Sequence, residues 1–110
     1  MDVKDVERNI NVAVNLLKAL SNERRLKIMC ALCQGEKNVG EMEDLVDLSQ
    51  SALSQHLARL RRDGMVSTRR EAQTIYYSVN DPAAKDILRC LCKIFNPGNQ
   101  EGKPSSDRIF

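Results

Sequence analysis

With 110 residues and a net charge of +2, the chain has the length of one domain. Only 4% of its residues are aromatic although 42% are hydrophobic, so the core must be mostly aliphatic, which favours helices over an all-β sandwich. The first residues, MDVKDVERNI, are charged and lack the apolar segment of a signal peptide, and no apolar run approaches the ~20 residues that span a bilayer. We therefore expect a cytoplasmic protein with no membrane partner, whose four cysteines are reduced thiols.

The spacing of apolar residues predicts four helices before any strand. Residues 3–20 carry apolar side chains at intervals of three and four, in an arc broad enough to touch more than one neighbour. Ser21 or Asn22 can cap the second helix, and Ser49 can cap the fourth, which Gly64 ends. The second, third and fourth helices are predicted at about residues 22–34, 39–47 and 49–64.

Strand-like residues follow Gly64. The runs MVSTRR and TIYYSV are rich in β-branched and aromatic residues, and EAQ separates them, which predicts a hairpin. Pro82 then lies in the first turn of a last helix that extends to about Phe95. The residues after it, NPGNQEGKPSSDRIF, predict a disordered tail over 96–110. The prediction is a mainly α domain over residues 1–95, with four helices, a small β-hairpin and a final helix.

The fourth helix, within LSQSALSQHLARLRRDG, has one apolar and one polar face. At about 100° per residue, Leu53, Leu57 and Leu60 align as a buried seam. The opposite face carries small and polar side chains: Ser51, Gln55, Ala58, Arg59 and Arg62. Hydroxyl, amide and guanidinium groups form hydrogen bonds with base edges and phosphates in a major groove, and a small side chain permits close approach.

His56 is the single histidine of the chain and raises the alternative of a catalytic site. It lies at the edge of the apolar seam, turned away from Ser51, and the helix has no acidic residue on that side to orient an imidazole. Catalysis needs a nucleophile, a base and an orienting group that converge. Packing or a surface hydrogen bond is therefore the favoured role for His56, and we expect no enzyme.

Positive charge is concentrated on this helix and on the hairpin after it. Residues 48–79 hold five arginines against Asp63 and Glu71, a net of +3, whereas residues 36–47 hold five acids against Lys37, a net of −4. An ordinary solvated helix face could also be charged, but here the small polar face and the basic hairpin coincide. Together they predict a surface that binds the phosphates of nucleic acid.

The segments LKALSNERRLKIM and LSQSALSQHLARLRRDGMVSTRREAQTIYYSV closely resemble the ArsR/SmtB family of bacterial winged-helix repressors, over about residues 14–95. The resemblance implies a winged helix-turn-helix homodimer, built by the first and last helices, that binds double-stranded operator DNA with an inverted repeat. The fourth helix would enter the major groove, and the hairpin wing would contact the backbone or the minor groove. The residues expected to face DNA are Gln50, Ser51, Ser54, Gln55, Arg59 and Arg62 from the helix, and Arg70, Gln73 and Thr74 from the wing.

Members of this family usually release DNA when an inducer binds. One family site has two cysteines at the start of the third helix, where this chain reads EKNVGE. Another uses aspartate and histidine pairs on the last helix, where DPAAKDILRCLCKIF contains no histidine. We therefore expect neither of these metal sites and no cofactor.

The cysteines resemble more closely those of the thiol- and persulfide-sensing subgroup that includes BigR and HlyU. In that subgroup a cysteine on the second helix pairs with one near the end of the last. Cys30 stands at the first position, whereas the second aligns with Asn96; Cys92 lies four residues before it, about one helical turn away. Cys92 also has basic neighbours, which favour a thiolate. The resemblance implies Cys30 and Cys92 as the sensing thiols, with Cys33 and Cys90 as alternates.

Other interpretations of the cysteines stay open. Three thiolates could hold a soft ion such as arsenite. Alternatively, the protein could be a DNA binder with no inducer, whose four thiols simply pack, since a free cysteine behaves as a small hydrophobe. Cys30-Ala-Leu-Cys33 is also a CxxC motif, as in thiol-disulfide oxidoreductases, but those motifs begin a helix after a strand and this one lies late in a helix. The function expected is a transcriptional repressor that an oxidant or a persulfide releases from its operator.

Overall fold

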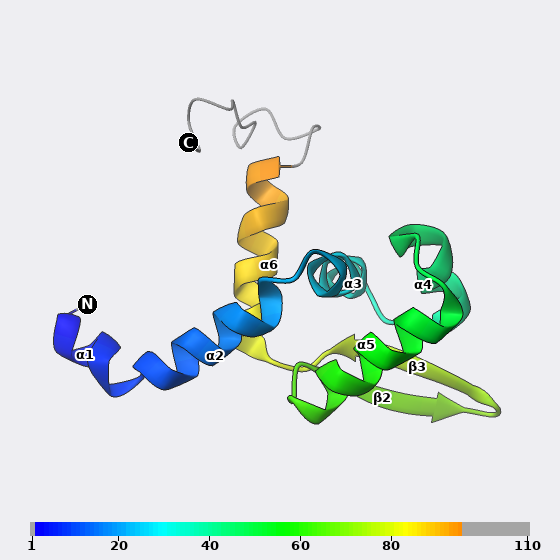
Figure 1. Cartoon of the computed structure of the whole chain (residues 1–110), viewed down its shortest axis with the longest axis horizontal. Helices are drawn as coiled ribbons and strands as arrows, with labels where there is room; N and C mark the ends of the chain where they lie inside the picture. Colours follow the sequence, from blue (N-terminus) through cyan, green and yellow to red (C-terminus); the bar gives the residue numbers. More distant parts are fainter. Residues whose placement is uncertain (1, 96–110) are drawn as a thin grey trace.

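The computed structural model describes residues 2–95. Figure 1 shows α3, α5 and the β2–β3 hairpin packed together, with α2 and α6 extending away from this body. No helix in residues 2–95 has the length and apolar character to cross a membrane. The tail predicted over 96–110 lies outside the described residues. The elements are α1 (Val3–Arg8), α2 (Ile10–Leu20), α3 (Glu23–Cys33), β1 (Lys37–Asn38), α4 (Val39–Val46), α5 (Gln50–Arg62), β2 (Val66–Glu71), β3 (Thr74–Val79) and α6 (Pro82–Phe95).

Side-chain caps determine where α3 and α5 begin. The Oδ1 atom of Asn22 accepts hydrogen bonds from the backbone N–H groups of Arg24 and Arg25, at 3.1 Å each. Ser49 Oγ accepts from the N–H of Ala52 at 3.1 Å. These bonds satisfy donors that a helix cannot satisfy itself. Ser49 is thus confirmed as a cap, and of the two candidates Ser21 and Asn22 it is Asn22 that caps α3.

The single helix predicted over residues 3–20 is wrong, because the helix is interrupted at Asn9. Asn9 has φ −115° and ψ 13°, outside the helical region, and its Nδ2 donates to the carbonyl of Asp5 at 3.0 Å. Asparagine side chains compete with the helical hydrogen bonds of the backbone and so favour helix ends. The apolar periodicity continues through this break, so periodicity alone predicted one helix where the structure has α1 and α2.

The core is aliphatic, as the composition predicts, and it fixes the orientation of α5. Leu53, Leu57 and Leu60 are fully buried, which confirms the predicted seam. They meet side chains from α3, α4 and α6 in one cluster. The largest fully buried residues are Ile28, Met29, Met42, Leu53, Leu57, Leu60 and Leu88. Because the seam is held against this cluster, the polar face of α5 must point outward.

The strands form a three-stranded antiparallel sheet in the order β1-β3-β2. The strand β1, which pairs Lys37 with Tyr77, was not predicted, because two residues are too few to show an alternation of apolar and polar side chains. Glu71 pairs with Thr74, so the hairpin loop has two residues, shorter than the predicted EAQ. Ala72 has a φ of 56°, as tight hairpin turns require. The predicted winged helix-turn-helix is otherwise confirmed: α4 and α5 are followed directly by the wing.

Candidate nucleic-acid interface

The outward face of α5 presents every side chain predicted to face DNA from this helix. All of them are exposed: Gln50, Ser51, Ser54, Gln55, Arg59 and Arg62. Arg59 Nε lies 3.5 Å from a carboxylate oxygen of Asp63 one turn later. An exposed pair of this kind contributes about 0–1 kcal/mol, so Arg59 can exchange Asp63 for another anion at small cost. The face therefore offers hydroxyl, amide and guanidinium donors along the length of one helix.

The wing residues predicted to contact DNA differ in how exposed they are to solvent. Arg70 and Gln73 are exposed, whereas Thr74 is half-buried. Arg69, which the charge count above included, is already occupied: its guanidinium binds Glu36 and Glu71. Thus Arg69 forms ion pairs within the protein, and Arg70 is the wing arginine that is placed to bind a ligand.

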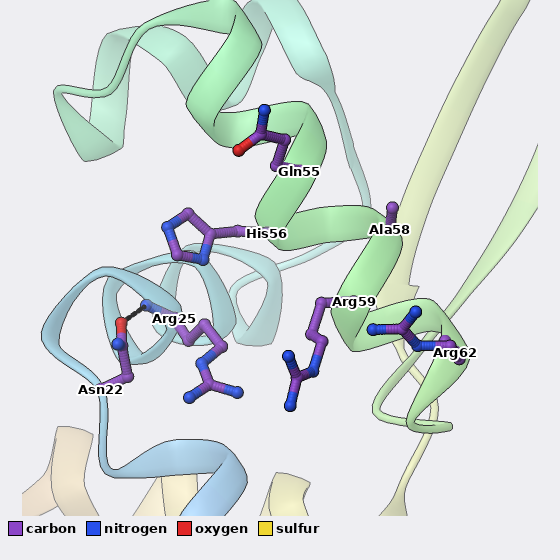
Figure 2. A pocket seen from close by; sticks show the side chains of 7 residues that line it. All are labelled: Asn22, Arg25, Gln55, His56, Ala58, Arg59 and Arg62. Carbon is purple, nitrogen blue, oxygen red and sulfur yellow. Dashed lines mark hydrogen bonds between the residues drawn. The ribbon is translucent and has the colours of Figure 1, made fainter.

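A pocket joins the outward face of α5 to the N-terminal end of α3 (Figure 2). His56 is half-buried and points from α5 toward α3, and Arg25 and Arg59 point into the same space from opposite sides. The sequence pattern predicted no role for Arg25, and it favoured packing or a surface hydrogen bond for His56. The lining residues are Asn22, Arg25, Gln55, His56, Ala58, Arg59 and Arg62, with no carboxylate among them.

The structure brings the thiols of Cys30 and Cys92 together from two different helices. Burial raises the pKa of the Cys30 thiol, and the charges of Cys92 and Cys33 and a side-chain hydrogen bond with Cys92 raise it further. Both Cys30 and Cys92 are half-buried, and α3 packs against α6. Cys30 therefore stays protonated at neutral pH, beside a second thiol.

The alternate cysteines lie in different surroundings. Cys33 is half-buried at the C-terminal end of α3 and is one of the groups that act on Cys30. Cys90 is exposed on α6. All four are free thiols. Within residues 2–95, no three side chains of His, Cys, Asp or Glu are grouped as metal ligands would be.

The chain is similar in sequence to known bacterial regulators. A family model described as "Bacterial regulatory protein, arsR family" matches residues 22–68. The chain is 49% identical over 100 residues to the transcriptional activator HlyU of Vibrio cholerae, a match that covers 91% of this chain and 93% of that protein.

Two solved structures share both the sequence and the fold. Reduced HlyU from Vibrio cholerae matches with a TM-score of 0.77 and 50% identity, over 84% of this chain and 97% of that chain. The transcriptional repressor BigR from Xylella fastidiosa matches with a TM-score of 0.81 and 40% identity, over 86% of this chain and 97% of that chain. These relatives are transcriptional regulators and not enzymes. The chain therefore belongs to the ArsR family of DNA-binding transcriptional regulators.

Proposed function

We propose that this regulator is a homodimer that represses transcription from an inverted-repeat operator and leaves that operator when Cys30 and Cys92 become joined. The observation that carries the proposal is the meeting of the two thiols, one on α3 and one on α6. Of these helices, α3 also packs against α5. A bond between the thiols would thus act on the helix that supports the DNA-reading face.

Exposed apolar side chains support the homodimer. Val3 and Val12 on α1 and α2 are 70% and 69% exposed, and Leu17 is 56% exposed. Figure 1 shows these helices extending away from the body of the protein. Large apolar patches on a small protein mark interaction sites. A second copy that brings α2 and α6 against their counterparts would cover Leu17 and Phe95, and a two-fold axis would relate the two α5 helices.

In this proposal α5 enters the major groove and the wing lies on the backbone. Gln55 and Ser51 present an amide and a hydroxyl to base edges, while Arg70 presents a charge to phosphates. Two such units on one two-fold axis meet half-sites whose centres lie about 34–36 Å apart, or a multiple of that spacing.

Oxidation would proceed through Cys92, because the raised pKa of Cys30 keeps that thiol protonated. With hydrogen peroxide, the Cys92 thiolate takes one oxygen and becomes a sulfenic acid, and water leaves. The Cys30 sulfur then attacks the Cys92 sulfur, which forms the disulfide and releases a second water. With a low-molecular-weight persulfide, Cys92 takes the terminal sulfur and the low-molecular-weight thiol leaves. Attack by Cys30 on the Cys92 sulfur then forms the same disulfide and releases hydrogen sulfide.

A bridge between α3 and α6 would tie the proposed dimerisation helix to the core that positions α5. The relative placement of the two α5 helices would then change, and operator affinity would fall. A coupling of about 1–3 kcal/mol is sufficient, since it corresponds to a change of about 5–150-fold in affinity.

The test uses an operator selected from random DNA by the reduced protein. Affinity is measured before and after treatment with hydrogen peroxide or a persulfide, and intact mass reports the bond formed. Cys30→Ser and Cys92→Ser should bind normally when reduced and resist the treatment. Cys33→Ser, on the same helix as Cys30, and Cys90→Ser, on the same helix as Cys92, should still respond.

A wild-type response in Cys92→Ser would contradict the proposed bridge. Retention of arsenite by the wild type, lost in Cys30→Ser and Cys33→Ser, would favour the soft-ion alternative instead. Repression is tested separately with a reporter gene behind the selected operator: BigR is described as a repressor and HlyU as an activator, so the direction needs its own measurement.

A further inference from the structure

We infer that the pocket between α5 and the N-terminal end of α3 is a phosphate site, in which Arg25 and Arg59 hold the DNA backbone on the side of α5 away from the wing. The pocket is lined by residues of two helices that the sequence separates, and Figure 2 shows the guanidinium groups of Arg25 and Arg59 facing the same space. The inference rests on the proposed insertion of α5 into the major groove and adds a contact from outside the helix-turn-helix.

The positive charge of the pocket favours an anion as its ligand. Arg25, Arg59 and Arg62 line it without a carboxylate. Arg25 is half-buried, and in the described part of the chain it belongs to no ion pair. Asp63 lines the adjoining pocket and binds Arg59 only loosely, at 3.5 Å. Guanidinium groups that meet in one pocket repel one another, and a phosphate relieves this repulsion while matching the donor geometry of arginine.

Side chains, not backbone groups, would hold the phosphate. The Asn22 side chain already accepts hydrogen bonds from the N–H groups of Arg24 and Arg25, so these backbone donors are occupied. The N-terminal end of α3 still contributes the positive end of its dipole. His56 adds a ring nitrogen at the edge of the pocket, on the side toward α3. The donors that line the pocket therefore include the guanidinium groups of Arg25, Arg59 and Arg62 and the imidazole of His56.

The pocket is continuous with the DNA-reading face. Gln55 and Arg62 belong both to the outward face of α5 and to the lining of the pocket. A helix in the major groove has one DNA strand on each side, across a groove about 12 Å wide. The helix α5 packs against α3 and against β2 of the hairpin. The wing is thus placed to contact one strand with Arg70, and Arg25 is placed to contact the other.

Arg25→Gln and Arg24→Gln form a matched pair for the test. Arg24 precedes Arg25 on the same turn of α3, is exposed and lies outside this pocket, so each variant removes one positive charge from nearly the same place. Affinity for the selected operator and for a random 30-base-pair duplex is measured at several salt concentrations. The slope of log K against log salt should become shallower by about 0.9 per protomer in Arg25→Gln and stay unchanged in Arg24→Gln. Equal slopes for the two variants would overturn the inference.

A second measurement uses the wild type and avoids any effect of Arg25→Gln on folding. Neutral methylphosphonate linkages are placed one at a time along a half-site of the operator. We expect operator affinity to fall about tenfold when one particular linkage is neutral, and this linkage should lie on the strand opposite to the one that Arg70 of the wing contacts. Losses confined to the strand contacted by the wing would contradict the inference.

A free anion is the competing occupant, because the volume of about 470 Å³ lies within the range of about 300–1,000 Å³ typical of small-ligand pockets. Inorganic phosphate is therefore titrated at constant ionic strength against thermal unfolding. Stabilisation of the wild type but not of Arg25→Gln, with unchanged DNA salt slopes, would assign the pocket to free phosphate and overturn the DNA contact. Gln55→Ala tests the insertion of α5 into the major groove independently. A wrong assignment of Arg25 can therefore be distinguished from a wrong placement of α5.

Discussion

Arg69 on β2 binds the carboxylate of Glu36, which lies before β1 and 33 residues earlier in the sequence. Arg69 Nε is 3.1 Å from each carboxylate oxygen, and the guanidinium carbon lies 4.7 Å from the centre of the Tyr76 ring. Arg69 also binds Glu71 on its own strand at 2.9 Å. The wing is thereby tied to the segment that connects α3 to α4, and this tie holds the wing in place relative to α5.

Replacement of Glu36 should weaken DNA binding through the position of the wing. Glu36→Gln removes a negative charge near DNA, which by itself would strengthen binding, so Asp44→Asn on α4 serves as a control with the same charge change. We expect Glu36→Gln to bind the operator up to about fivefold more weakly than Asp44→Asn, because the wing must then be ordered during binding. Equal affinities of the two variants would show that the Glu36–Arg69 pair does not position the wing.

The same pair should make stability depend on pH in acid. The hydrogen bond from Arg69 lowers the pKa of Glu36, so the folded state favours the charged carboxylate. Its contribution to stability is then fully present above the usual range of a glutamate and is lost as pH falls through the lowered pKa. The difference in free energy of unfolding between wild type and Glu36→Gln should be present at pH 7 and vanish in strong acid. A difference that grows as pH falls would contradict this assignment.

Gln55 and Arg70 should differ in what they contribute to DNA binding. Gln55→Ala should cost roughly 1–3 kcal/mol on the operator and little on random DNA, because an amide reads base edges. Arg70→Ala should weaken binding to both and make the salt dependence shallower, because it removes a phosphate contact. Affinities measured on both duplexes test the distinction, and equal losses for Gln55→Ala on operator and random DNA would remove its reading role.

The sequence predicted those parts of the fold that local rules determine. Leu53 and Leu57 lie in a seam set by helical geometry, and Asn22 and Ser49 are caps that act within three residues. The break at Asn9 was missed because a local side-chain hydrogen bond overrides a periodicity that continues through it. The strand β1 is too short for any pattern to indicate it.

The candidate site likewise has a part that could be predicted from the sequence and a part that could not. The outward face of α5 follows from one helix, so its residues could be predicted as a set. The pocket could not, because Arg25 and His56 lie on different helices and only packing brings them together. Arg69 shows the reverse error: it counted toward a basic wing, yet its distant partner Glu36 occupies it. Contacts between distant segments leave no local pattern from which to read them.

The pH dependence of Cys30 alkylation should depend on the neighbouring thiol of Cys92. Burial, and after it the nearby thiols, raise the pKa of Cys30, so its alkylation by iodoacetamide should accelerate only at a higher pH than that of an ordinary thiol. Cys92→Ser replaces an ionisable thiol with a hydroxyl and so removes the Coulombic effect of Cys92, which should shift the alkylation profile of Cys30 to lower pH. Mass spectrometry of the alkylated peptide measures both profiles, with the exposed Cys90→Ser variant as a control. Unchanged profiles in Cys92→Ser would mean that the two thiols do not interact.

Leu17 and Leu45 allow a matched test of the homodimer. They are 56% and 57% exposed, on α2 and α4 respectively, and only Leu17 lies on the proposed dimer surface. Burying one leucine contributes about 1.5–3 kcal/mol, and a two-fold axis uses each contact twice. Leu17→Asp should therefore raise the dimer dissociation constant by a hundredfold or more, at about 1.4 kcal/mol per factor of ten. Leu45→Asp should leave it unchanged. Sedimentation equilibrium measures the constants, and operator affinity should fall with Leu17→Asp alone, because a monomer meets one half-site. A wild type that sediments as a monomer at micromolar concentration would contradict the homodimer itself.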